Sequence, residues 1–304
     1  MEMTTKYAIE GKNITKKLKG FNLDIDDLKV PKGFATALIG ENGAGKTTLL
    51  NILSGLRLDY KGDITFFGRY SDKEKEDNGN VKNRIGYTGT GKYYLPQWTV
   101  RDIENISKIL FEDFSEDRFR KYCDELAIFP HGQLDMKKPN SSFSDGMKVK
   151  LMLAGVLSRD TDMLILDEPA SPLDPLMRDK LCQLISEYIN NGNGEKSVFF
   201  STHNISDMEN ITDYAIIMEN GQIVEQGFVE DLKEKYIVIK GDAADTQKAK
   251  DILYTITTNP YGFEGICLSE NLDKLAGLNV TKEIPTLYQI SVAVMKNNTK
   301  IVMR

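Results

Sequence analysis

The amino-acid sequence predicts an α/β fold built around a parallel β-sheet, and three observations support this prediction. Two short, almost wholly apolar runs, 163–166 and 197–200, have the composition of strands that are buried on both faces of a sheet. A helical pattern over 176–190 lies between them and ends in a segment rich in Asn and Gly. A third apolar run, 34–39, is followed by a glycine-rich loop and a second helical pattern. This alternation of strands and helices is typical of a parallel sheet with helices on its faces.

The N-terminal part of the chain is expected to add an antiparallel β edge to this core. Residues 7–40 read as short strands with turns at Gly11, at Gly20 and at 31–33, where Gly and Pro interrupt the apolar pattern. A further strand is expected at 63–68.

The middle of the chain changes from strand to helix patterns. The polar stretch 71–80 is expected to be a solvated loop, and 84–87 a strand. Apolar residues recur at helical spacing within 99–159, which predicts a helical subdomain. A hairpin is expected over 214–225, because Asn-Gly stands between two strand-like runs.

These patterns divide the chain into four segments. The core is expected to comprise 1–98 and 160–240, with the helical subdomain 99–159 inserted between its two parts. Residues 241–304 are expected to form a small α+β segment of their own.

Composition limits the possible classes of protein. The formal net charge of −6 argues against non-specific nucleic-acid binding, which depends on an excess of Lys and Arg. The three cysteines, Cys123, Cys182 and Cys267, are far apart, as expected for reduced thiols in a cytoplasmic protein. The first residues lack the apolar stretch of a signal peptide, and no run approaches the ~20 apolar residues of a membrane span. We therefore expect any work at a membrane to be done through a partner.

Residues 40–48 match the phosphate-binding motif G-x-x-x-x-G-K-[ST] in full. The motif stands between a strand pattern and a helical pattern, which is the setting that it requires. Its glycines let backbone N–H groups converge on phosphate oxygens at a helix N-terminus. The sequence therefore predicts that a nucleoside triphosphate is bound by Asn42, Gly43, Ala44, Gly45, Lys46, Thr47 and Thr48.

Two carboxylates, Asp167 and Glu168, follow the apolar run 163–166, at the edge where ligands bind in open α/β sheets. Lys46 is expected to reach the β- and γ-phosphates. Thr47 and Asp167 are expected to hold Mg²⁺, the latter through its water shell. Glu168 is expected to orient and polarise the water that attacks the γ-phosphate.

With these motifs, residues 7–236 resemble the nucleotide-binding subunit of ABC transporters. The family's signature motif, usually Leu-Ser-Gly-Gly-Gln, has its counterpart at 143–147, with changes at the third and fifth positions. The resemblance implies that Ser144, Asp145 and Gly146 bind the γ-phosphate of ATP held by a second copy. The charge of Asp145 is expected to weaken closure on ATP unless its side chain points away. An ordinary helix N-cap at Ser144 is compatible with this role.

The resemblance extends to two later motifs. Residues 171–175 resemble the family's D-loop, which crosses the interface between two copies and places Asp174 at the shared site. Residues 201–203 resemble the switch-histidine motif, which implies that His203 hydrogen-bonds the γ-phosphate. We expect no role for His131, which falls at no motif.

Two positions depart from the family pattern. Family members carry a glutamine that links Mg²⁺ to the membrane subunit, and an ungapped count from Ile85 places Thr90 at that position. Gln97 comes seven residues later, so Thr90 is the expected residue, holding Mg²⁺ through water. Leu18 stands where the family has an aromatic that stacks on adenine, which leaves Leu18, Phe21 and Tyr7 as the candidates.

The resemblance implies an α/β P-loop NTPase of the ABC type that uses ATP and Mg²⁺. It is strongest to the ATPases of bacterial ABC-2-type exporters, above all those for antimicrobial and cytolytic peptides. Two copies would sandwich two ATP molecules. An integral membrane permease would be the further partner, and no nucleic acid is expected to bind. The chain would then be cytoplasmic and peripheral on the inner face of the cell membrane.

Further expectations and alternatives follow from the same resemblance. The aromatic segment 93–98 would either pack the helical subdomain or form a groove for a helix of the membrane subunit. The segment 241–304 would stabilise the homodimer. Export of drugs or lipids, or a soluble ABC-type ATPase that moves no cargo, are the alternative functions.

Overall fold

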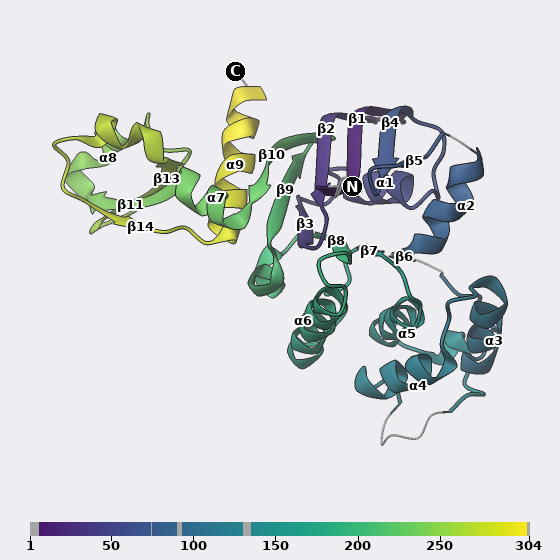
Figure 1. The fold of residues 1–304 in the computed structure, drawn as a ribbon. Coiled ribbons are helices and arrows are strands. Elements are labelled where there is room, and N and C mark those ends of the chain that lie inside the picture. Colours follow the sequence, from purple (N-terminus) through teal and green to yellow (C-terminus); the bar gives the residue numbers. More distant parts are fainter. Residues whose placement is uncertain (1–5, 74, 90–92, 130–134, 303–304) are drawn as a thin grey trace.

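The computed structural model describes residues 6–73, 75–89, 93–129 and 135–302. A six-stranded sheet forms the centre of the molecule, in the order β10-β9-β3-β8-β7-β6 (Figure 1). Five of these strands pair in parallel, and β10 pairs antiparallel with β9. The strands are β3 Ala35–Ile39, β6 Ile85–Thr88, β7 Met163–Leu166, β8 Ser197–Thr202, β9 Tyr214–Glu219 and β10 Gln222–Phe228. The predicted α/β fold with a parallel sheet is confirmed.

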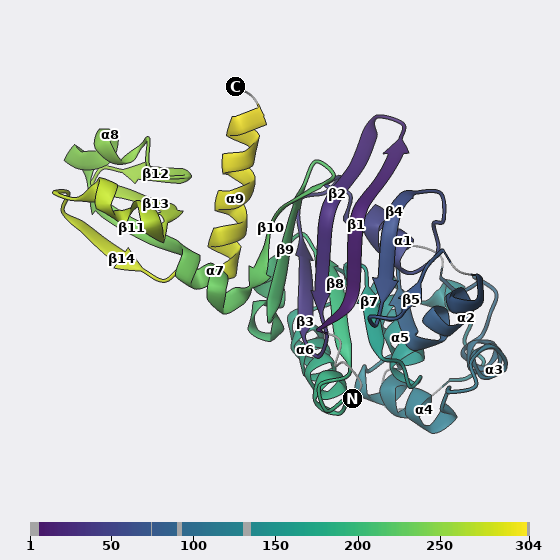
Figure 2. The same ribbon diagram turned by 45° about the horizontal axis from the view of Figure 1, so that its top comes forward.

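A second, antiparallel sheet covers one face of the central sheet, with the order β2-β1-β4-β5 (Figure 2). It consists of β1 Tyr7–Leu18, β2 Phe21–Pro31, β4 Lys61–Phe66 and β5 Tyr70–Ser71. Apolar side chains of this sheet, of α1 (Lys46–Leu53) and of one face of the central sheet share a single buried cluster. This cluster fixes α1 and the loop before it between the two sheets.

Helices cover the opposite face of the central sheet. Alternate residues of β3 show the division: Ala35, Ala37 and Ile39 belong to the helix-side core, whereas Leu38 belongs to the core shared with the antiparallel sheet. Period-two alternation of this kind follows from the pleat of a strand. The helices on or near this side are α3 Val100–Leu110, α4 Glu116–Glu125, α5 Asp145–Leu157 and α6 Pro175–Asn190.

The C-terminal part forms a smaller antiparallel sheet, β12-β13-β11-β14, with a buried cluster of its own. Its helix α9 returns to the main body, where Leu287, Ile290 and Ala293 are fully buried in the larger core (Figure 1). The elements of this part are α7 Val229–Lys235, β11 Tyr236–Asp242, α8 Thr246–Ala249, β12 Thr255–Asn259, β13 Gly262–Leu268, β14 Val280–Glu283 and α9 Leu287–Val302. No helix of the described ranges is long and apolar enough to cross a membrane.

Two local expectations were wrong. Gly11 is no turn: it lies inside the long strand β1, paired with Leu28 and Ile64. A Cβ there would lie 2.5 Å from Cδ1 of Ile14, so the glycine makes room for a packed side chain. The expected loop over 71–80 contains the start of α2 (Lys75–Arg84). One buried apolar residue, Val81, anchors that helix, which is too little to produce a readable period.

Candidate functional site

The phosphate-binding motif forms the loop between β3 and α1, at the carboxyl edge of the central sheet. Gly45 precedes α1 with a φ of 105°, a left-handed conformation that glycine adopts without strain. Gly40 has no room for a side chain, because a Cβ would overlap the backbone oxygen of Met218 on β9. The loop therefore needs glycine for its conformation at Gly43 and Gly45, and for close backbone approach at Gly40.

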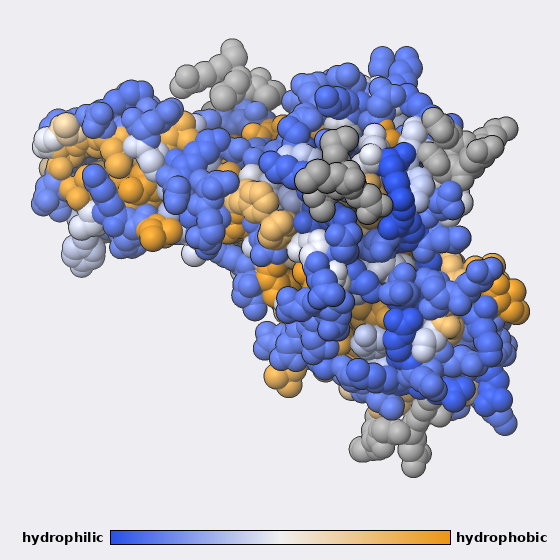
Figure 3. Space-filling model, viewed as in Figure 1, coloured by the Kyte–Doolittle hydropathy of each residue, from blue (hydrophilic) through white to orange (hydrophobic). Residues whose placement is uncertain are grey.

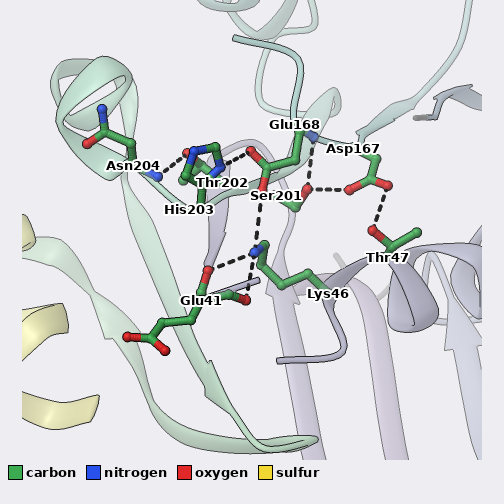
Figure 4. A network of polar contacts seen from close by, with 10 residues as sticks. Glu41, Lys46, Thr47, Asp167, Glu168, Ser201, Thr202, His203 and Asn204 are labelled. Atoms are coloured by element: carbon green, nitrogen blue, oxygen red, sulfur yellow. Dashed lines mark hydrogen bonds and ion pairs between the residues drawn. The ribbon is translucent and has the colours of Figure 1, made fainter. Parts of the chain in front are cut away.

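Lys46 points back into this loop (Figure 4). Its Nζ donates to the backbone oxygens of Gly40 at 2.7 Å and Glu41 at 3.2 Å, and lies 3.4 Å from Oε1 of Glu168. The side chain is only 6% exposed. A buried ammonium group surrounded by acceptors is therefore held where the loop curves.

Ser201 connects the carboxylate of Asp167 with the backbone of Glu168, just after β7. Thr47 Oγ1 donates to Asp167 Oδ2 at 2.9 Å, and Ser201 Oγ donates to Asp167 Oδ1 at 2.6 Å (Figure 4). The same hydroxyl oxygen accepts from the backbone N–H of Glu168 at 2.9 Å. Sequence reasoning gave Ser201 no role, although its position two residues before His203 at the same sheet edge was a usable signal.

Glu168 and His203 contact each other directly. His203 Nδ1 lies 2.8 Å from Glu168 Oε2, and the other carboxylate oxygen is buried and faces Lys46 (Figure 4). When the Glu168 carboxylate is ionised it can only accept, so Nδ1 of His203 carries a hydrogen and donates this hydrogen bond. Glu168 has a φ of 50°, which is uncommon for a residue with a side chain and is found more often at functional sites.

Thr47 and Asp167 bring a hydroxyl and a carboxylate together, which are oxygen donors of the kind that Mg²⁺ prefers. The described residues contain no group of three or more His, Cys, Asp or Glu side chains placed to hold a metal. The two donors fit an ion that takes its remaining ligands from phosphate and water oxygens.

The signature residues lie at the N-terminus of α5. Ser144 is the N-cap, and its Oγ accepts from the backbone N–H of Met147 at 3.3 Å. Asp145 is 91% exposed and forms an ion pair with Lys148 at 3.1 Å. Gly146 lies against the D-loop, because a Cβ there would be 2.8 Å from the backbone oxygen of Pro172. The N-cap is confirmed, and the contact with ATP of a second copy stays a prediction.

Asp174 is also a helix cap. Its carboxylate accepts from the backbone N–H of Met177 at 3.1 Å, at the start of α6. Pro175 follows as the first helical residue, where its missing N–H costs nothing. The side chain is exposed, so a role for Asp174 across a subunit interface stays a prediction.

A cleft of about 660 Å³ separates the sheet edge from the helical subdomain. Tyr94 packs its hydroxyl over Gly155 of α5, and burial raises the pKa of this hydroxyl. Tyr93 is partly exposed, so the aromatic segment packs the subdomain and lines the cleft at once. The lining side chains and backbone come from Asn42, Thr88, Gly89, Tyr93, Tyr94, Pro96, Asn140, Ser141, Asp145, Lys148, Val149, Met152, Asp167, Glu168, Ser171, Pro172 and His203.

The other residues named from the sequence are the candidates for the Mg²⁺-linked glutamine position and for the adenine contact, together with His131. Thr90 and His131 lie outside the described residues. Gln97 is exposed and does not line the cleft. Phe21 lies against the phosphate-binding loop, where Gly45 would clash with its ring if it had a Cβ. Tyr7 begins β1, at the far end of the hairpin from Phe21, and pairs with Pro31.

Comparisons with known proteins agree with this geometry. Residues 23–171 match the family described as ABC transporter. The energy-coupling factor transporter ATP-binding protein EcfA2 of Methanospirillum hungatei is 29% identical over 213 residues, which are 67% of this chain and 50% of that protein. The bacitracin transport ATP-binding protein BcrA of Enterococcus faecalis is 29% identical over 255 residues, 83% of this chain and 79% of that protein. The chain thus spans half of the first relative and about four fifths of the second.

Solved structures share the fold. An ATP-binding subunit of an ABC transporter has a TM-score of 0.63 at 23% identity and covers 74% of this chain and 92% of its own. The dimeric ATP-binding cassette MJ0796, in a post-hydrolysis state with ADP and Pi, has a TM-score of 0.61 at 19% identity, covering 72% of this chain and 98% of its own. Residues 23–171 therefore belong to the ABC transporter family, and the chain carries an ATP-binding, ATP-hydrolysing domain of that family.

Proposed function

We propose that this chain is the ATPase subunit of a bacterial ABC exporter and powers the export of peptides through a separate membrane subunit. The observation that carries the ATPase part is the contact of Lys46, Glu168 and His203 in one cluster, beside the Thr47–Asp167 pair. A phosphate-binding lysine, a candidate general base and a polar sensor then lie at one sheet edge.

ATP would be bound by residues 42–48 and would replace the internal partners of Lys46. The Nζ group now contacts two backbone oxygens and Glu168, and it would turn to the β- and γ-phosphates. A Mg²⁺ ion held by Thr47 and, through water, by Asp167 would neutralise developing phosphate charge. Ser201 would keep Asp167 oriented through its short hydrogen bond.

Hydrolysis would depend on Glu168 once Lys46 has moved to the phosphates. Its freed carboxylate would accept a hydrogen bond from the attacking water and polarise it. His203 already contacts Glu168 and would reach the γ-phosphate from the same position.

The second half of each site would come from another copy of the chain. Ser144 caps α5 and leaves backbone N–H groups at an exposed helix N-terminus, which favours an anion. Gly146 adds no side chain there. The ion pair of Asp145 with Lys148 offsets the negative charge that would otherwise face phosphate. Asp174 would lie at the same interface.

The membrane subunit would dock beside the cleft. Tyr93 and Leu95 are exposed next to it, and Ile109 and Leu110 are exposed at the end of α3. Figure 3 shows apolar side chains near α3, and further ones over the C-terminal sheet and near the centre of this face. A short helix could bury the exposed groups beside the cleft, which would place the chain on the inner face of the cell membrane.

Peptide cargo is supported by the likeness to a bacitracin transport ATP-binding protein. The test of the ATPase role is Glu168→Gln, which should abolish turnover and trap a dimer with bound ATP. Glu230→Gln, an exposed carboxylate on α7, is the matched control and should behave as the wild type. Unchanged phosphate release by Glu168→Gln would refute the proposal.

A further inference from the structure

One arginine, Arg178, connects two loops that the ATPase site uses. It lies in the first turn of α6, and its Nε donates to the backbone oxygen of Leu173 at 2.9 Å. Its NH1 donates to Oδ1 of Asp207 at 2.7 Å. The first contact holds the D-loop, and the second holds the loop that follows β8.

Each of these loops carries one partner of the central contact. Glu168 begins the turn that leads to Leu173, and the backbone bond from Ser171 N–H to the Glu168 oxygen (3.2 Å) makes that turn compact. On the other side, Asp207 comes four residues after His203. Arg178 therefore bridges the two segments whose side chains meet at 2.8 Å between Glu168 and His203.

Partial burial and a second contact from α6 stabilise the bridge that Arg178 forms between the two loops. Arg178 is 29% exposed and Asp207 is 20% exposed, so the pair is partly shielded from water. The backbone of Asp207 accepts a second contact, from Sγ of Cys182 on α6 at 3.7 Å. A guanidinium group has donors on separate nitrogens in a fixed planar fork, so it can hold an oxygen on each loop at a set spacing, whereas an ammonium group carries its three donors on one nitrogen.

We propose that Arg178 is a positioning residue for ATP hydrolysis: it holds the D-loop and the loop after β8 so that His203 stays on Glu168. This inference rests on the proposed roles of Glu168 and His203. Because the D-loop is the segment expected to meet a second copy, the same bridge would pass a displacement of that loop on to His203.

The direct test is nitrogen-15 NMR of the histidine rings in the nucleotide-free protein. The chain has two histidines, so His131→Gln assigns the signals of His203. In Arg178→Gln we expect these signals to move toward the positions seen in Glu168→Ala, where the partner is gone. Arg84→Gln is the matched control: its ion pair with Asp162 is similarly exposed (32% for Arg84) but joins the starting ends of β6 and β7, at the sheet edge away from Asp167 and Glu168.

Steady-state ATPase assays supply the second measurement. Arg178→Gln should lower kcat on the order of 10- to 100-fold with KM within about twofold, as misplaced catalytic groups do. Arg178→Lys should fall between this variant and the wild type. The Arg84→Gln control should keep its kcat within about twofold, even where its Tm falls.

Unmoved His203 signals in Arg178→Gln would overturn the inference, and so would moved signals with an unchanged kcat. If Arg178→Gln does not fold, Arg178→Lys and Asp207→Asn carry the same two measurements. Failure of the proposed function is recognised separately, because turnover would then survive Glu168→Ala itself.

Discussion

Individual residues at the site are held by a few short contacts that the chain makes only when folded. Ser201 is the clearest case, since one hydroxyl group bonds both Asp167 and the backbone of Glu168. Its removal leaves two polar groups short of a partner at the point where a magnesium ion and a water molecule would be held. If Asp167 and Glu168 are held less precisely, the ATPase turnover should fall more than the affinity for the nucleotide.

Replacement of this hydroxyl gives the first prediction. Ser201→Ala should lower kcat by about 10-fold or more, because Asp167 and Glu168 lose their shared orienting bond. Ser186→Ala is the control, since that hydroxyl bonds only the Cys182 oxygen within α6. Steady-state ATPase rates of the two variants decide the matter, and equal rates would contradict the orienting role.

The close approach of Gly40 to β9 gives the second prediction. Gly40→Ala should destabilise the fold by about 1–3 kcal/mol and weaken ATP binding, because a methyl group would push the loop away from the Met218 oxygen. Gly20→Ala has open space around it and a φ of 78°, so it should cost only about 1–2 kcal/mol and leave ATP affinity intact. Denaturant unfolding and ATP titration measure both effects, and wild-type ATP affinity in Gly40→Ala would be the contrary result.

At the scale of elements, the hairpin of β1 and β2 brings an aromatic residue to the nucleotide loop. Phe21 lies at the start of β2 and against Gly45, whereas Tyr7 lies at the far end of β1. The sequence left Leu18, Phe21 and Tyr7 open as partners of the base. The position of the hairpin favours Phe21, and its base contact is our proposal.

Phe21→Ala should therefore weaken ATP binding by about 1–3 kcal/mol if the ring stacks on the base. Phe21→Tyr should retain the affinity, and Tyr7→Ala serves as the control for loss of a ring elsewhere on the hairpin. Titrations with ATP compare the three variants. An affinity of Phe21→Ala equal to that of the wild type would show that the ring does not contact the base.

The N-terminus of α5 provides a prediction about assembly. Asp145→Gly should tighten the ATP-dependent dimer, because a negative charge near the phosphates is removed, and should cost the helix about 0.3–1 kcal/mol. Lys148→Gln should loosen it, since Asp145 would lose its partner. Sedimentation in the Glu168→Gln background measures both, and opposite or absent shifts would contradict an interface at this helix end.

The sequence predicted the parts that depend on local patterns. The strand–loop–helix motif at 40–48 and the carboxylates after β7 are fixed by short stretches, and both lie where they were expected. Ser201 and Arg178 were missed, because their importance comes from contacts with residues 34 and 29 positions away. The helix α2 was missed because a single buried valine carries no period.

The whole molecule combines a family core with a C-terminal unit that is tied to the active-site side. The backbone N–H of Leu287, at the start of α9, donates to Glu209 at 2.8 Å, six residues after His203. Nearby, Ile284 is 80% exposed and Tyr288 is partly exposed. An apolar surface at this junction supports our proposal that 241–304 stabilises a homodimer.

Charges at this junction should weaken assembly if the proposal is right. The double variant Ile284→Lys, Tyr288→Lys should raise the dimer dissociation constant with ATP by about 10-fold, since each side chain offers apolar area for burial. Tyr261→Lys is the control, because Tyr261 is even more exposed but lies in the turn between β12 and β13. An unchanged dissociation constant in the double variant would assign the dimer contact to the core alone.

The central claim is that each ATP site is completed by two copies, Lys46 and Glu168 from one and Ser144 from the other. The most direct measurement is the ATPase rate per molecule across a wide dilution series, with the mass of the particles recorded at each concentration. We predict that the rate per molecule rises with concentration and follows the dimer fraction. A constant rate in strictly monomeric protein would contradict the account.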